Sequence, residues 1–119
     1  MPSGYRLYYV TTYELIPGKA MDAREWYTQG RALWLRLPGV RSVDAYVQQF
    51  ALGAASQQLE IWTEIDDYAV LDQWDGAAAE FGDEVVALAK IAAGCVRQGP
   101  ARLVGDYMGS DVRDLQQGG

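Results

Sequence analysis

The sequence predicts an α+β domain of the ferredoxin-like type, with the element order βαββαβ and a four-stranded antiparallel sheet that carries its helices on one face. Two observations support this fold class. The order strand, helix, strand occurs twice between Tyr5 and Met108. The strand segments alternate with a period of two, whereas the helical segments repeat with a period near 3.6. The length of 119 residues fits one domain, which we place at residues 1–108, followed by a C-terminal tail at 109–119.

The first strand and the first helix are the most regular segments of the chain. Odd positions of the strand face the helices, and they are Tyr5, Leu7, Tyr9, Thr11, Tyr13 and Leu15. Pro17 and Gly18 end this strand, and a helix follows to about Arg36. Its apolar stripe contains Ala23, Trp26, Tyr27, Gly30, Leu33, Trp34 and Leu37. Pro38 and Gly39 close the helix.

The second and third strands repeat the alternation. Their helix-facing residues are Val43, Ala45, Val47, Leu59, Ile61 and Ile65, and residues 51–56 between them read as a hairpin connection. Asp66 and Asp67 predict the start of a short helix that is interrupted at Gly76. A further helix is expected from Ala77 to Ala93, ended by Gly94. The last strand is expected at 101–108, with residues 96–100 as an approach segment.

The face of the sheet that points away from the helices has an unusual composition. It collects Tyr8, Thr12, Glu14, Asp44, Tyr46, Gln48, Phe50, Glu60, Trp62 and Glu64. This set is too aromatic for a solvated face and too acidic for a dry core. A water-containing interface between two sheets satisfies both observations, so we expect a homodimer that forms through these faces. The alternative is an ordinary exposed sheet face in a monomer.

Composition excludes several classes of function. A net charge of −6 with scattered basic residues argues against nucleic acid as a partner. No apolar stretch approaches the ~20 residues of a membrane span, and we expect a cytoplasmic protein with no membrane partner. The chain has no histidine and a single cysteine, Cys95, which reads as a small buried hydrophobe. We therefore expect no metal site, no haem and no other cofactor.

The chain resembles the dimeric α+β barrel superfamily, in particular its antibiotic-biosynthesis-monooxygenase-like and NIPSNAP-like members, in four segments: YELIPGK, LPGV, LEIWTEIDDY and LDQW. The quinone-forming monooxygenases of that superfamily carry an asparagine four positions before a tryptophan on the third strand. Gln58 stands at the asparagine position here, and Trp62 matches the tryptophan. The resemblance implies a cofactorless oxygenase whose aromatic substrate supplies the electrons.

The haem-degrading relatives carry a different signature. Aligned on the PGK turn, Thr11 stands at their first-strand asparagine, and Trp74 matches their tryptophan. Their iron-binding histidine falls at Glu84 or Val85. Because this chain has no iron ligand at that position, the resemblance does not extend to haem degradation.

The superfamily's pocket lies between the sheet and the helices. In this chain that pocket would gather Tyr9, Thr11, Tyr13, Trp26, Trp34 and Trp74. Phenol and indole groups could stack on a planar ligand and hydrogen-bond its carbonyl group. Two functions stay open. One is a cofactor-independent monooxygenase-like or isomerase-like enzyme for a small hydrophobic or aromatic metabolite. The other is a non-catalytic small-molecule-binding or stress-response dimer. The alternative to a pocket is that the same aromatic residues fill the core.

Overall fold

The computed structural model describes residues 6–47 and 57–106. Several sequence predictions therefore lie outside the described residues. They concern Tyr5, Gln48, Phe50, the connection at 51–56, the end of the last strand at Met108, and the tail at 109–119.

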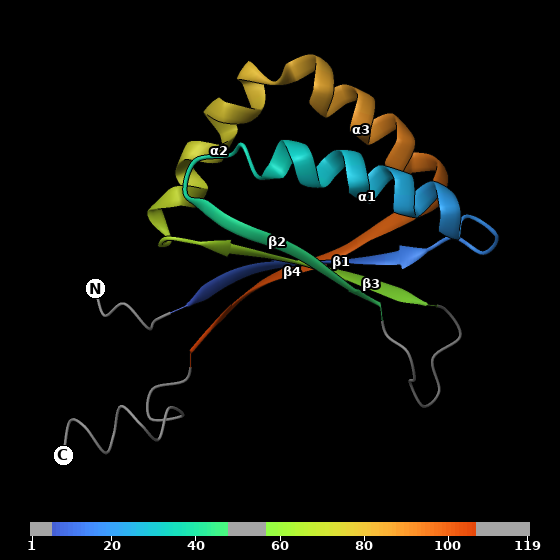
Figure 1. The fold of residues 1–119 in the computed structure, drawn as a ribbon, viewed down its shortest axis with the longest axis horizontal. Helices are drawn as coiled ribbons and strands as arrows, with labels where there is room; N and C mark the ends of the chain where they lie inside the picture. The colour runs from blue at the N-terminus through green and yellow to red at the C-terminus, as the bar shows by residue number, and fades with distance from the viewer. Residues whose placement is uncertain (1–5, 48–56, 107–119) are drawn as a thin grey trace.

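The described residues form seven elements in two layers, with the helices covering one face of the sheet (Figure 1). In chain order they are β1 (Leu7–Leu15), α1 (Ala20–Trp34), β2 (Val40–Val47), β3 (Gln58–Ile65), α2 (Ala69–Glu80), α3 (Gly82–Cys95) and β4 (Val96–Gly105). The strand order is β2-β3-β1-β4, and the pairs are antiparallel. This topology confirms the predicted ferredoxin-like fold class.

The register of the strands fixes which side chains share a face. Tyr9 lies opposite Thr63 on β3 and Leu103 on β4, whereas its neighbour Val10 lies opposite Trp62 and Arg102. Successive residues point to opposite sides of a sheet. The odd residues of β1 therefore face the helices, as predicted. The other side, which we call the open face, carries the even residues of β1.

The core lies between the helices and the sheet. Its main cluster consists of Ala23, Trp26, Leu33, Val43, Leu59, Ile61, Leu88, Cys95 and Val96. A smaller cluster under α2 consists of Leu7, Ile65 and Val70. Val10 is also fully buried, although it belongs to the open face. Its cross-strand neighbours are Trp62 and Arg102, and the Arg102 guanidinium lies 5.9 Å from the Trp62 ring centroid.

The sequence predicted a break between the last two helices at Gly76, and this prediction was wrong. The α2 helix continues through Gly76 to Glu80, and Phe81 leaves the helical conformation with φ −95° and ψ 20°. A lone glycine lowers helix stability by about 1 kcal/mol but does not prevent helical dihedral angles. Phe81 accepts a hydrogen bond from the Val85 amide at 3.0 Å, so that α3 begins directly after the break.

The predicted end of α3 and the predicted start of β4 were also wrong. Helix α3 includes Gly94, ends at Cys95, and passes without a loop into β4 at Val96. Residues 96–98 pair with β1, and the register then shifts between Thr11 and Tyr13. This irregularity brings Gly99 close to the backbone of Thr12. A Cβ at Gly99 would lie 3.2 Å from the Thr12 carbonyl oxygen. Glycine and proline at 99–100 thus mark a bulge rather than the edge of the strand.

Membrane-spanning structure is absent from the described helices. Within residues 6–47 and 57–106, none is both long enough and apolar enough to cross a bilayer.

Candidate functional site

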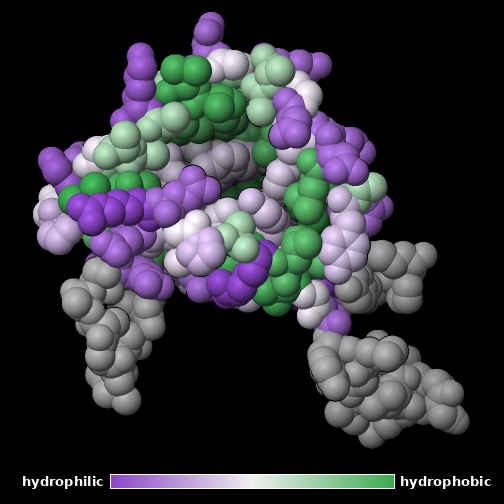
Figure 2. Space-filling view, turned by 180° about the vertical axis from the view of Figure 1, so that it is seen from behind, coloured by the Kyte–Doolittle hydropathy of each residue, from purple (hydrophilic) through white to green (hydrophobic). Residues whose placement is uncertain are grey.

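A hollow lies between the helical layer and the sheet. It consists of two adjoining cavities of about 360 and 210 Å³, which share Tyr13, Trp34, Leu37, Trp74 and Gln98 in their walls. We call them together the helix-side cavity. The space-filling view shows an opening below the helices, with apolar groups inside it (Figure 2). The larger part is at the lower end of the usual size of small-ligand sites, about 300–1,000 Å³.

Three aromatic rings in edge-to-face contact form the wall on the α1 side, and a fourth ring outside the cavity, Tyr27, packs against one of them. The Trp26 ring lies 4.9 Å from Tyr13 and 5.6 Å from Trp34, at interplanar angles of 72° and 77°. Trp34 also contacts Tyr27 at 6.3 Å. Trp26 and Trp34 are both on the core-facing side of α1, where the helical repeat of the sequence places them. The wall is therefore built from rigid groups that fix one another's orientation.

Trp74 forms the wall contributed by α2. Its indole N–H donates a hydrogen bond to the Pro38 carbonyl oxygen at 3.0 Å. Its ring meets Tyr9 edge to face, with the centroids 5.4 Å apart. The hydrogen bond and the ring contact hold the indole from two sides. Trp74 borders both parts of the cavity. Because these two contacts hold the indole in place, the space beside it stays open.

Polar groups enter the cavity from the sheet and from α2. Tyr9, Thr11 and Tyr13 of β1 line the smaller part together with Thr63 and Gln98. Burial raises the pKa of the Tyr13 phenol, and a side-chain hydrogen bond with Thr11 partly offsets this rise. Tyr13 is thus a neutral hydrogen-bond donor at neutral pH. Asp75 is the acidic residue in the wall of the larger part.

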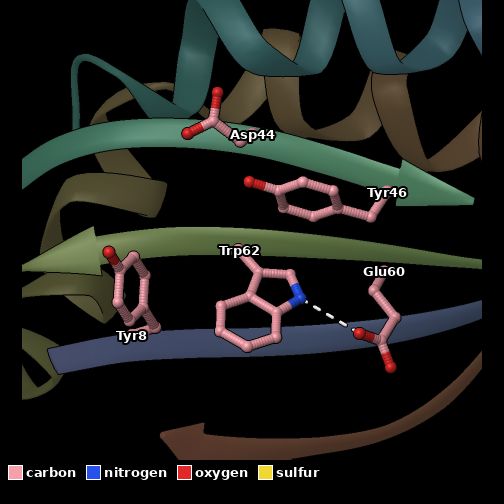
Figure 3. Close-up of a pocket in the computed structure, with 5 residues that line it drawn as sticks. All are labelled: Tyr8, Asp44, Tyr46, Glu60 and Trp62. Carbon is pink, nitrogen blue, oxygen red and sulfur yellow. Dashed lines mark hydrogen bonds between the residues drawn. The ribbon is translucent and has the colours of Figure 1, made fainter. Parts of the chain in front are cut away.

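A second hollow, of about 340 Å³, lies on the open face (Figure 3). Trp62 is at its centre, with Tyr8 at 5.3 Å and Tyr46 at 6.1 Å between ring centroids. The Trp62 indole N–H donates to Glu60 at 3.0 Å, and Arg102 pairs with Glu60 at 3.3 Å. The described residues that line this hollow all belong to strands, and Asp44 completes the set.

The structure divides the eight predicted site residues into two groups. Tyr9, Thr11, Tyr13, Trp26, Trp34 and Trp74 line the helix-side cavity. Gln58 and Trp62 lie on the open face, because they alternate with the buried helix-facing residues Leu59 and Ile61. The two positions that resemble the quinone-forming monooxygenases therefore share no cavity with the other six. The sheet separates them.

Gln98 and Asp75 line the helix-side cavity but were not predicted as site residues from the sequence. Gln98 pairs with Tyr13 across the strands and presents an amide to both parts of the cavity. Its segment was interpreted as an approach to the last strand because of Gly99 and Pro100. Strict period-two alternation carried back from Ala101 would have placed Gln98 on the open face, because the bulge at 99–100 shifts the alternation by one residue. No periodic signal distinguishes Asp75 from the other carboxylates of α2.

The described residues offer no cluster of three or more histidine, cysteine or carboxylate groups suited to a metal ion. Cys95 is buried, its thiol donates to the Ile91 carbonyl oxygen at 3.3 Å, and burial raises its pKa. A neutral buried thiol is a poor metal ligand.

Comparison of sequences alone finds no match among protein-family models and none among curated proteins. Solved structures are similar. An assigned antibiotic biosynthesis monooxygenase from Bordetella bronchiseptica matches with a TM-score of 0.62 and 16% identity, over 86% of this chain and 95% of that chain. SnoaB, a cofactor-independent oxygenase from Streptomyces nogalater, matches with a TM-score of 0.59 and 12% identity, over 89% and 97%.

A third similar structure is an ethyl tert-butyl ether degradation (ethd) family protein from Bacillus halodurans. It matches with a TM-score of 0.57 and 20% identity, over 86% of this chain and 99% of that chain. At these identities the likeness concerns the fold. The chain therefore has the α+β fold of the antibiotic-biosynthesis-monooxygenase-like proteins, which confirms at the level of the fold the resemblance seen in its sequence.

Proposed function

We propose that the protein binds a small planar aromatic metabolite in the helix-side cavity and promotes its oxidation by O₂ without a metal or a bound cofactor. The observation that carries this proposal is the cavity itself. Aromatic walls that are held in place by ring contacts and by the Trp74 hydrogen bond enclose open space, rather than collapsing into a packed core. Polar donors from β1 and β4 face the same space.

The geometry supports binding and orientation of an electron-rich ring system. The rings of Trp34 and Trp74 would contact the faces or edges of a planar ligand. The Tyr13 phenol and the Gln98 amide would donate hydrogen bonds to a carbonyl or phenolate oxygen, and stabilise charge that develops on that oxygen. Asp75 is the carboxylate that would accept a proton from the substrate.

The reaction that we propose requires no external reductant. An activated ring CH₂ group gives up its two hydrogens and receives one oxygen atom of O₂ as a carbonyl oxygen. The second oxygen atom leaves with both hydrogens as water. All electrons come from the substrate, so the chain needs only to position the ring and to stabilise its anion. The alternative function, binding without catalysis, uses the same cavity.

Ligand titration of matched variants tests this proposal. Quinones, hydroxyquinones and polyphenols are titrated by calorimetry against the intact protein, Trp74→Phe and Trp62→Phe. Loss of the larger ring from the cavity wall is expected to weaken a planar ligand by about fivefold in Trp74→Phe, which corresponds to about 1 kcal/mol. Trp62→Phe makes the same change on the open face and should leave the affinity unchanged.

Oxygen uptake in the presence of each bound ligand separates the two functions. Uptake that depends on the protein supports the oxygenase, whereas binding without uptake supports the non-catalytic alternative. If no planar aromatic compound binds, or if Trp62→Phe weakens binding as much as Trp74→Phe does, the site proposal fails.

We also propose that a second copy of the chain covers the open face. Tyr46 is 57% exposed there, beside the half-buried rings of Tyr8 and Trp62. An aromatic cluster of this kind on one side of a sheet is typical of an interface, and the carboxylates around it keep the interface polar. Nucleic acid is not among the partners that we propose, because the chain carries a net charge of −6.

A further inference from the structure

Helix α1 carries one glycine on its core-facing side, next to the aromatic wall. Gly30 is buried in the middle of the helix, one turn before Trp34. A methyl group at position 30 would lie 2.6 Å from Cη2, 2.8 Å from Cζ2 and 3.0 Å from Cζ3 of the Trp34 indole. These three atoms form the outer edge of the benzene ring. The indole is thus folded back along α1 and occupies the place that a side chain at position 30 would need.

This arrangement is specific to Gly30. Glycines 76, 82 and 94, which also belong to helices, have no atom within 4 Å of the position that a Cβ would take. Glycine in a helix interior lowers helix stability relative to alanine by about 1 kcal/mol. At position 30 that loss is offset by a contact that alanine cannot make.

The position of Trp34 determines how much room the cavity has. Trp34 borders both parts of the helix-side cavity, and Trp26 and Tyr27 flank it along α1. A ring that is pushed away from the α1 backbone moves toward the open space that it borders. Trp26 is only 3% exposed and therefore offers the ring no room in the other direction.

We propose that Gly30 is a specificity-determining residue, which lets Trp34 lie flat against α1 and so opens the cavity to planar ligands of two or more fused rings. This inference rests on the proposed function for its ligand class. It concerns only the width of the cavity, and it makes no claim about catalysis. With alanine at position 30, the displaced indole would leave room for single-ring compounds only.

The test compares Gly30→Ala with the matched control Gly76→Ala, which makes the same change in a helix where nothing obstructs it. Affinities are measured by calorimetry for a naphthoquinone and for a benzoquinone. Gly30→Ala should weaken the naphthoquinone by about tenfold, because overpacking of this size is costly, and should alter the benzoquinone less than about twofold. Gly76→Ala should change neither affinity. The double variant Gly30→Ala/Trp34→Phe removes the clashing atoms and should bind the naphthoquinone as Trp34→Phe does.

A second readout needs no ligand. The protein is labelled with 5-fluorotryptophan, and the ¹⁹F resonance of Trp34 is assigned by its absence in Trp34→Phe. Gly30→Ala should shift this resonance, and Gly76→Ala should not. An unshifted resonance, or an equal loss of affinity for both quinones, overturns the inference. If the intact protein binds neither these quinones nor any other planar aromatic compound, the proposed function fails, and a shifted resonance still supports the displacement of Trp34.

Discussion

Among the described residues, burial raises the pKa of three side chains that are neutral when protonated. The pKa values of Tyr13, Tyr27 and Cys95 are all raised, and in each the largest cause is the removal of the group from water. Tyr13 borders the cavity, Tyr27 contacts Trp34, and Cys95 lies in the main core cluster. Each of these groups therefore favours the protonated form in the folded state more strongly than in the unfolded chain.

The free energy of unfolding should consequently fall in alkaline solution. The unfolded chain releases these protons from about pH 8.5 for a thiol and about pH 10 for a phenol, whereas the folded chain retains them to higher pH. In that interval the unfolded state binds fewer protons, so stability is complete below it and decreases as pH rises through it. Urea denaturation at a series of pH values measures the decrease. Tyr13→Phe should make it shallower, and an unchanged slope would contradict this assignment.

Which residues line the site could be predicted where sequence periodicity decides the face. Alternation on β1 placed Tyr9, Thr11 and Tyr13, and the helical repeat placed Trp26 and Trp34. Periodicity does not describe how distant strands are aligned. Gln98 was therefore missed, because its place depends on pairing with β1 across a bulge. The burial of Val10 depends equally on side chains from two neighbouring strands.

At the scale of whole elements, two turns use glycine in the left-handed region. Gly18 precedes α1 with φ +80°, and Gly39 precedes β2 with φ +73°. A Cβ at Gly18 would meet no atom within 4 Å, whereas one at Gly39 would collide with the side chain of Val70 on α2. The second turn therefore has two requirements, its backbone conformation and close contact with a helix that follows much later in the chain.

Alanine substitution should separate these two requirements. Gly18→Ala is expected to lower the free energy of unfolding by about 1–2 kcal/mol, because only the backbone is strained. Gly39→Ala combines the same strain with an overpacked contact, and should cost about 1–3 kcal/mol more. Equilibrium denaturation in urea gives both values. Equal losses would show that the contact between Gly39 and Val70 contributes nothing.

The order of elements could be predicted from the sequence, but not all of their boundaries. Pro17 with Gly18 and Pro38 with Gly39 predict turns, and the structure has turns at both places, between β1 and α1 and between α1 and β2. Gly76 also predicts a break, but the helix continues through it, because a helix tolerates a glycine whose neighbours continue the hydrogen-bond ladder. The break falls instead at Phe81, whose ring packs under the Arg36 guanidinium at 4.4 Å from its centroid. Such a tertiary contact leaves no periodic trace in the sequence.

At the scale of the whole molecule, the open face should determine the oligomeric state. Tyr46 on this face and Tyr68 on the helical side are similarly exposed, at 57% and 60%. Tyr46→Asp adds a third carboxylate beside Asp44 and Glu60, and should convert a dimer into a monomer in light scattering. Tyr68→Asp should leave the dimer intact. A monomeric intact protein at micromolar concentration would contradict the sheet-to-sheet arrangement.

The cytoplasmic location stays a prediction.

The position of β1 in the sheet also has a consequence for biosynthesis. This strand lies in the interior of the sheet, and one of its two partners is β4, the last of the described strands to be made. On the ribosome, β1 must wait with one edge unpaired until residues 96–105 have emerged. Contacts between such distant segments slow folding, because the chain must close a long loop before they form. The sheet around β1 is thus complete only after β4 has been made, and β1 is the described strand that nascent-chain chaperones have most time to meet.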